Sequence, residues 1–161
     1  MPYRNAPRLA SFDYIGPYSY FVTMCTVGRI RLFTTEAAVA RPRDQLRDVA
    51  SAEGFAIPAY CFMPDHLHLL IEARADSCNG LKFIARAKQF SGFYYTLQIR
   101  RTLWQRYGYE HVLRDDEDTR GVARYIFENP VRASLVQSPQ NYPFLGSDTH
   151  SVSEVLEFTS G

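Results

Sequence analysis

The sequence lacks any apolar run close to the roughly 20 residues that a membrane-spanning helix needs. The N-terminal residues include no apolar segment of the kind that directs secretion. Cysteine is scarce: Cys25, Cys61 and Cys78 are an odd number and no two of them form a CxxC pair, which disfavours a disulfide framework. Together these absences predict a protein of the reducing cytoplasm.

The remaining composition is that of an ordinary globular protein. The chain has 161 residues, of which 46% are hydrophobic and 22% charged, enough for one domain with its own core. After Val136 the sequence is punctuated by Ser, Pro and Gly. We therefore expect a domain over residues 1–137 and a C-terminal tail over residues 138–161 that packs on it.

Charge is distributed unevenly along the chain. The net charge is +1, but residues 82–114 contain seven basic residues and a single acid. Arginine supplies 16 of the 18 basic residues of the whole chain, and its guanidinium suits bidentate contacts with phosphate. A nucleic-acid contact and a solvated helix face both explain the basic stretch.

The order of the expected elements predicts a fold class. Aromatic and β-branched residues favour strands, and capping residues with helical periodicity favour helices. Strands are expected at residues 18–27, 55–62, 66–73 and 110–113, and helices at residues 35–53, 80–100 and 115–129. This order predicts an α+β, ferredoxin-like antiparallel sheet with helices packed on one face.

Three prolines qualify these elements. Pro42 is expected to kink or split the first helix, since proline removes a helical hydrogen bond. Pro58 indicates an edge strand or a bulge, and Pro130 is expected to open a turn after the last helix.

The most distinctive local feature is the pair His66 and His68. Residues two apart on a strand project to the same face, so both imidazoles would stand together while Leu67 and Leu69 enter the core. Two neutral imidazoles side by side can hold one divalent cation. Two histidines on a solvated sheet face are the simpler alternative.

A second pair, Tyr125 and Asn129, lies four residues apart on an expected helix and therefore shares a helix face. Tyrosine can act as a covalent nucleophile, and an asparagine oxygen is a hard ligand suited to Mg²⁺ or Mn²⁺. A tyrosine packed in the core explains the same pattern. Cys61 would allow a zinc site with the histidines, but it lies across the turn from His66, and no fourth soft ligand is evident.

Several segments resemble one protein family. They read YCFMPDHLHLL at residues 60–70, WQ at 104–105 followed by YEHVLR at 109–114, and YIFENPVRA at 125–133. In this order and spacing they resemble the REP-associated tyrosine transposases, a branch of the single-tyrosine, IS200-like HUH transposases. The segments at residues 16–26 and 142–144 also fit, so the resemblance extends over roughly residues 8–147.

The resemblance implies a ferredoxin-like domain that cleaves and rejoins single-stranded DNA near palindromic hairpins. It implies that His66 and His68 bind a metal ion, Mg²⁺ or Mn²⁺, that Asn129 is the third ligand, and that Tyr125 is the nucleophile, forming a 5′-phosphotyrosine. The chain departs from the family at Ser134, where many members carry glycine.

The expected partner is single-stranded or hairpin DNA, and both a monomer and a homodimer are compatible with the sequence. Backbone contacts are expected from Lys82, Arg86, Lys88, Arg114 and Arg132. Unpaired bases would stack on aromatic side chains, for which the candidates are Tyr94, Tyr95, Trp104, Tyr107 and Tyr109.

Two other functions compete with the transposase interpretation. One is a metal-dependent nuclease that uses water while Tyr125 only packs in the core. The other is a non-catalytic hairpin-binding protein for DNA or RNA, which the presence of both histidines, the tyrosine and the asparagine disfavours.

Overall fold

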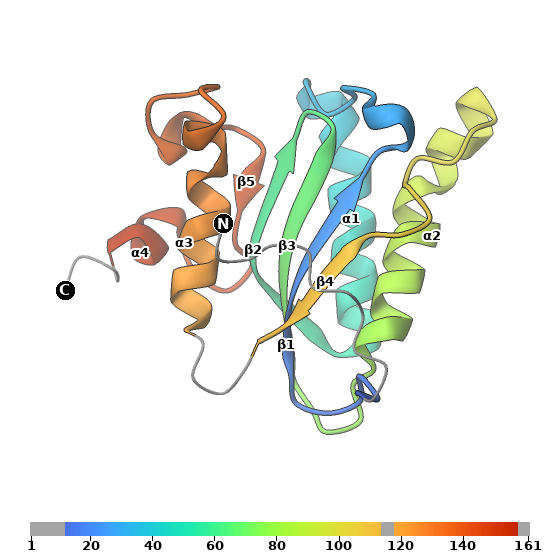
Figure 1. Cartoon of the computed structure of the whole chain (residues 1–161), viewed down its shortest axis with the longest axis vertical. Coiled ribbons are helices and arrows are strands. Elements are labelled where there is room, and N and C mark those ends of the chain that lie inside the picture. The colour runs from blue at the N-terminus through green and yellow to red at the C-terminus, as the bar shows by residue number, and fades with distance from the viewer. Residues whose placement is uncertain (1–11, 114–117, 158–161) are drawn as a thin grey trace.

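The computed structural model describes residues 12–113 and 118–157. Its centre is an antiparallel sheet of five strands in the order β4-β1-β3-β2-β5 (Figure 1). The strands are β1 (Ser19–Cys25), β2 (Phe55–Met63), β3 (His66–Ala73), β4 (Tyr109–Val112) and β5 (Leu145–Gly146). β3 lies at the centre and pairs antiparallel with both β1 and β2. The four strands expected from the sequence are confirmed.

Two long helices, α1 (Glu36–Glu53) and α2 (Gly80–Ile99), pack side by side on one face of this sheet (Figure 1). The Thr35 side chain caps α1 by accepting a hydrogen bond from the Ala38 amide, and the Asn79 side chain caps α2 in the same way. Gly54 ends α1 in the left-handed conformation, with a φ of 79°, which glycine adopts without strain. No helix within the described ranges is long and apolar enough to cross a membrane.

The opposite face of the sheet carries α3 (Thr119–Arg132), with the short α4 (Val152–Glu157) beside it (Figure 1). The α+β antiparallel class is confirmed, but the expectation of helices on one face describes only α1 and α2. The α3 side of the sheet is itself apolar in places, since Phe21, Cys61 and Leu70 are buried there. A sheet with apolar side chains on both faces needs a helix on each.

The structure tests what the sequence predicts at each of the three prolines. β2 and β3 shift register between Ala56 and Ala59, which confirms the irregularity expected at Pro58. The expected split at Pro42 does not occur, because α1 runs through this buried residue as a single helix, and the alternative of a kink there stays a prediction. The expected turn at Pro130 is also wrong: α3 continues to Arg132, since a proline in the last turn removes only one helical hydrogen bond.

The start of α3 also differs from the sequence expectation. Asp115 and Asp116, the expected capping residues, lie outside the described residues. Asp118 caps the helix instead, because its carboxylate accepts a hydrogen bond from the Arg120 amide.

Residues beyond 138 complete the sheet at the outer edge of β2. The Phe62 amide donates to the Phe144 carbonyl over 2.8 Å, and the Tyr142 hydroxyl donates to the Phe62 carbonyl over 2.6 Å. Asp148 forms an ion pair with Arg47 of α1 at 2.9 Å. The segment from Tyr142 to Asp148 therefore covers an edge strand, which is otherwise prone to pairing with other chains. The boundary at residue 137 stays a prediction.

Ser134, which follows α3, has a φ of 60° and is solvent-exposed. A non-glycine residue is strained in this region, whereas glycine is not. We expect Ser134→Gly to raise the free energy of unfolding by up to about 1 kcal/mol in urea titrations. The neighbouring Ala133, with a φ of −84°, is the control: Ala133→Gly should lower it by about 0.5–1 kcal/mol. Equal effects at both positions would contradict this explanation.

Candidate metal and tyrosine site

His66 and His68 project from the same face of β3, and their rings meet edge to face with centroids 4.7 Å apart. Leu67, between them, is fully buried on the other face, beneath α1 and α2. The alternation along β3 is the one that the strand spacing predicts.

Hydrogen bonds orient both imidazole rings through their Nδ1 atoms. His66 Nδ1 lies 2.7 Å from Asp65 Oδ1, and the other carboxylate oxygen of Asp65 accepts a hydrogen bond from Arg29 Nε at 2.9 Å. His68 Nδ1 lies 2.9 Å from the Thr23 hydroxyl. With Nδ1 engaged in each ring, Nε2 is the atom left to bind a metal, and the Asp65–His66 pair has the geometry of a carboxylate behind a metal-binding histidine.

Both rings are neutral at physiological pH. Burial lowers the pKa of His66, although the hydrogen bond to Asp65 opposes this shift. Burial also lowers the pKa of His68 to about 3, and the nearby charges of His66 and Arg132 contribute to the same shift. Neutral imidazole is the form that coordinates a cation, so neither ring would have to release a proton to bind one.

Tyr125 lies on α3, on the histidine face of the sheet, and is partly buried. The Phe21 ring contacts Tyr125 and one of the two histidines, with its centroid 6.1 Å from that of Tyr125 and 5.5 Å from that of His68. The fold therefore brings Tyr125 and His68, which are far apart in sequence, into contact with the same phenylalanine ring.

Asn129, one helical turn beyond Tyr125, is partly buried, and its Nδ2 atom is buried without a hydrogen-bond partner among the described residues. Unpartnered buried amide groups are rare in folded proteins. Rotation of the amide exchanges its nitrogen and oxygen, so an ion bound at this place would give the buried end of Asn129 a contact. The residues present thus fit a hard divalent cation.

Arg132 adds positive charge at this end of α3. Its guanidinium carbon lies 3.9 Å from the centre of the Tyr125 ring, and its Nη2 donates to the Tyr125 carbonyl at 2.7 Å. The same charge reaches His68, whose pKa it helps to lower. Arg132, one of the basic residues expected to contact DNA, is therefore in contact with Tyr125.

A zinc site receives no support. Within the described ranges, no three His, Cys, Asp or Glu side chains gather closely enough to hold a metal. The sequence argument that the turn separates Cys61 from the histidines is nevertheless wrong, since strand pairing places Cys61 directly opposite His68. The thiol is fully buried, and burial raises its pKa well above the usual range, which disfavours the thiolate that zinc requires.

The basic residues of α2 lie in the layer on the other side of the sheet. Arg86 forms an ion pair with Glu53 of α1 at 2.7 Å, and Lys82 approaches the same carboxylate at 3.8 Å. Lys88 donates to the main-chain carbonyls of Gln105 and Arg106. These contacts support the fold, and a DNA contact by these side chains stays a prediction.

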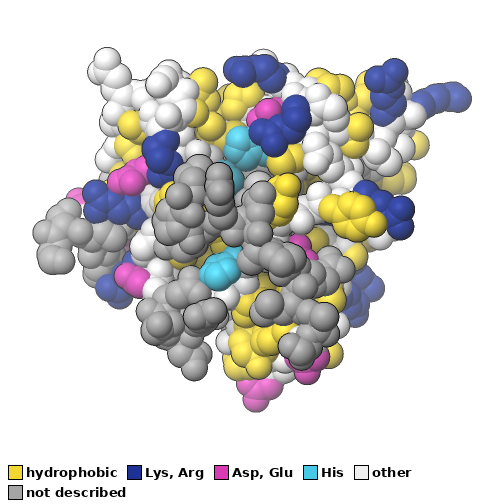
Figure 2. Space-filling view, viewed as in Figure 1, with side chains coloured by type: hydrophobic (Ala, Val, Ile, Leu, Met, Phe, Trp, Pro, Cys, Tyr) yellow, Lys and Arg dark blue, Asp and Glu magenta, His cyan; other side chains and the backbone are white. Residues whose placement is uncertain are grey.

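Two further expectations concern DNA. Arg114 lies outside the described residues. Trp104 is buried, with its ring against Phe33, so its expected role as a stacking platform is wrong. Figure 2 shows Lys and Arg side chains scattered over the visible face, interspersed with hydrophobic and acidic ones.

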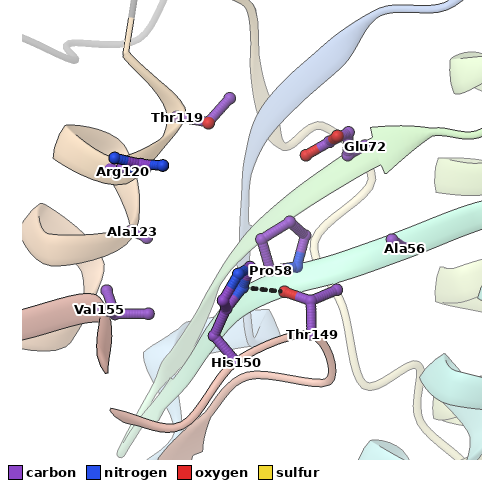
Figure 3. Close-up of a pocket in the computed structure, with 9 residues that line it drawn as sticks. All are labelled: Ala56, Pro58, Glu72, Thr119, Arg120, Ala123, Thr149, His150 and Val155. Carbon is purple, nitrogen blue, oxygen red and sulfur yellow. Dashed lines mark hydrogen bonds between the residues drawn. The ribbon is translucent and has the colours of Figure 1, made fainter. Parts of the chain in front are cut away.

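A separate hollow of about 290 Å³ lies near the start of α3, at the opposite end of β3 from His66 (Figure 3). Glu72 and Arg120 line it, together with His150, whose Nδ1 lies 2.9 Å from the Thr149 hydroxyl. None of the candidate metal ligands, nor Tyr125, faces this hollow.

Comparison with known proteins identifies the family. The family model described as "Transposase IS200 like" matches residues 16–129, a span that includes both histidines, Tyr125 and Asn129. The chain belongs to the IS200-like transposase family. The resemblance drawn from the sequence motifs is thereby confirmed, and transposase is the activity that this membership supports.

Individual relatives agree with the assignment. A Haemophilus influenzae protein named as a REP-associated tyrosine transposase is 29% identical over 136 residues, covering 78% of this chain and 77% of its own length. The solved structure of a REP-associated tyrosine transposase bound to a REP hairpin superposes with a TM-score of 0.72 at 23% identity, covering 87% of this chain and 82% of that one. A transposase structure from Deinococcus radiodurans gives 0.51 at 25% identity, covering 75% and 96%.

The sequence interpretation of this transposase missed the residues that orient the His66 and His68 rings. Thr23 and Arg29 come from the first strand and the loop after it, and nothing in their local sequence links them to β3. Asp65 had a detectable signal, because it directly precedes His66, but it was interpreted only as part of the turn.

If Asp65 orients His66, its carboxylate should increase metal affinity. We expect Asp65→Asn to weaken Mn²⁺ binding about 10- to 100-fold, since the neutral amide leaves His66 less basic and less firmly held. Isothermal titration calorimetry on the metal-free protein measures this. Asp76→Asn, in an exposed turn, removes the same charge and should leave the affinity unchanged. Equal losses in both variants would show a general charge effect instead.

The lowered pKa of His68 predicts a pH dependence of stability. Unfolded histidine has a pKa near 6.5 and folded His68 about 3, so acid protonates the unfolded chain first. The contribution of His68 to the free energy of unfolding is fully present above pH 6.5 and is lost as the pH falls toward 3. The test is urea unfolding of EDTA-treated protein at pH 7.5 and at pH 4.5. Between these two pH values, the free energy of unfolding should fall more for the parent than for His68→Gln. Parallel pH profiles would contradict the assignment.

Proposed function

We propose that this IS200-like transposase cleaves and rejoins single-stranded DNA with Tyr125 as the nucleophile and a divalent ion, Mg²⁺ or Mn²⁺, held by His66, His68 and Asn129. The observation that carries the proposal is that Tyr125 and His68 both contact Phe21, while the neutral His66 and His68 rings lie side by side. Neither helical nor strand spacing alone requires such a meeting.

The donor set suits a hard ion with open coordination positions. Two imidazole nitrogens and one amide oxygen leave room for phosphate oxygens, and an ion at this place would polarise the scissile phosphate and neutralise charge on it. Asp65 and Thr23 hold the two rings in place, so the ligands require little rearrangement.

In the proposed reaction the Tyr125 oxygen attacks the phosphorus and the phenol loses its proton. The bond from phosphorus to the 3′-oxygen breaks, and that oxygen leaves as a 3′-hydroxyl after gaining a proton. The products are a 5′-phosphotyrosine and a free 3′-hydroxyl. Since one phosphodiester replaces another, a different 3′-hydroxyl can reverse the step without ATP and join a new strand.

The substrate is inferred from the relatives and from charge. The solved REP-associated transposase is bound to a REP hairpin, and we infer that this chain also binds hairpin DNA with single-stranded flanks. Arg132 is suited to contact the phosphate backbone near the nucleophile, because it lies against Tyr125.

The substitution Tyr125→Phe tests the nucleophile. It removes one oxygen and keeps the ring, so folding and hairpin binding should persist. We expect cleavage and the covalent protein–DNA adduct to disappear together, as judged on a denaturing gel after incubation with hairpin DNA and Mn²⁺. Tyr18→Phe, at the far end of β1 from the histidines, is the matched control and should retain both activities.

The outcomes separate the competing functions. Cleavage by Tyr125→Phe at the parent rate would mean that water attacks, and the protein would then be a metal-dependent nuclease. If the parent protein binds the hairpin but neither cleaves it nor forms an adduct with any of the metal ions tested, it is a hairpin-binding protein.

A further inference from the structure

A pocket of about 500 Å³ lies between the first half of α1 and the second half of α2, on the side of the sheet away from Tyr125. Its walls are largely aromatic and aliphatic, with Phe33 and Leu103 on one side and Tyr94 and Tyr95 on α2. Arg41 is the one charged residue that lines it. The pocket therefore combines flat apolar surfaces with a single positive charge.

Arg41 is held in place for contact with a ligand. Its guanidinium carbon lies 3.6 Å from the centre of the Tyr94 ring, a stacked arrangement, and the side chain is exposed. Among the described residues no carboxylate lies within ion-pair distance of Arg41. One face of the guanidinium plane is covered by Tyr94, and the charge is left for an external anion or a flat polar group.

The inner wall of the pocket is rigid. Phe33 is buried, with its ring centroid 5.1 Å from that of Phe62 and 5.5 Å from that of Trp104. Trp104 is fixed in turn, because its indole nitrogen donates to the Ser91 hydroxyl over 2.8 Å. A preformed wall lowers the entropy cost of binding.

The pocket is physically linked to the turn that precedes the histidine pair. The Phe33 amide donates to the Pro64 carbonyl over 3.0 Å, and the Thr26 amide donates to the Asp65 carbonyl over 3.0 Å. Asp65 then contacts His66. The start of α1, the end of α2 and the β2–β3 turn lie at the same end of the molecule (Figure 1), so a strand that leaves the metal site can pass over the turn toward Arg41.

We propose that this pocket binds an unpaired nucleobase of the DNA strand that flanks the hairpin, stacked on the Arg41–Tyr94 pair. The inference rests on the proposed function for the identity of the strand. Bases flipped out of single strands stack on aromatic rings and on arginine planes, which is the pair of surfaces present here. The Gln98 amide on the same wall offers both a donor and an acceptor to a base edge.

The experiment compares two DNA probes of identical charge. Both are hairpins with mixed-sequence single-stranded flanks, but in one the flank bases are replaced by abasic sites. Fluorescence anisotropy gives the ratio of the two affinities. We expect the parent to prefer the base-bearing probe about tenfold or more, and Arg41→Gln or Tyr94→Leu to reduce that ratio to a fraction of the parent value. Arg74→Gln, an exposed arginine after the end of β3, removes the same charge and should keep the ratio.

A second measurement locates the base directly. Flanks that carry 5-iodouracil are irradiated with the full-length protein, and the cross-linked peptides are identified by mass spectrometry. Cross-links within residues 91–99 or 33–42 support the pocket. Cross-links confined to other segments, or equal affinity ratios in the parent and Arg41→Gln, overturn it. An Arg41→Gln variant that changes only self-association in size-exclusion chromatography would indicate an interface between copies, and likewise overturns it.

Failure of the pocket is distinguishable from failure of the proposed function. If the parent forms the covalent adduct but has the same ratio of affinities for the two probes as Arg41→Gln, the pocket alone is refuted. If the parent forms no adduct but prefers the base-bearing probe, and Arg41→Gln loses that preference, the nucleophile is refuted and the pocket is retained. A parent that binds neither probe refutes both.

Discussion

Strand β3 is hydrogen-bonded along both edges, to β1 on one side and to β2 on the other, and the rest of the molecule depends on that double pairing. The register decides which side chains of β3 face which helices. A slip of one residue would turn His66 and His68 toward α1 and α2 and would place Leu67 under α3. The candidate site therefore exists because two neighbouring strands hold the third in a single alignment.

The two faces of the sheet bury different kinds of side chain. The face under α1 and α2 buries Leu67 and Leu69 of β3. The face under α3 accepts two imidazoles, which burial keeps uncharged and which Asp65 and Thr23 engage by hydrogen bonds. Both imidazoles thus have a hydrogen-bond partner, whereas the buried end of Asn129 has none among the described residues, and the proposed ion would supply one.

Much of this arrangement could be predicted from local sequence. Strand alternation gives the shared face of His66 and His68, helical spacing gives the shared face of Tyr125 and Asn129, and capping residues give the ends of α1. These are properties of residues close together in the chain. The meeting of α3 with the histidine face could not be predicted in this way, since it depends on which face of the sheet the last helix covers. The same limit applies to Arg29 and Thr23, whose contacts with Asp65 and His68 follow from strand pairing across more than 30 residues.

Tyr125 and Asn129 lie on one helix, so neither can be repositioned without the other. A tilt or a sliding movement of α3 carries the phenol and the amide as one rigid body over β2 and β3. An ion that fixes Asn129 would therefore restrict the motion of the phenol, and DNA that fixes the phenol would strengthen binding of the ion by the same factor, because coupling between two ligands is reciprocal. If both proposed roles hold, any substitution along α3 that alters its docking angle acts on ion affinity and on strand transfer together, because one helix carries both side chains.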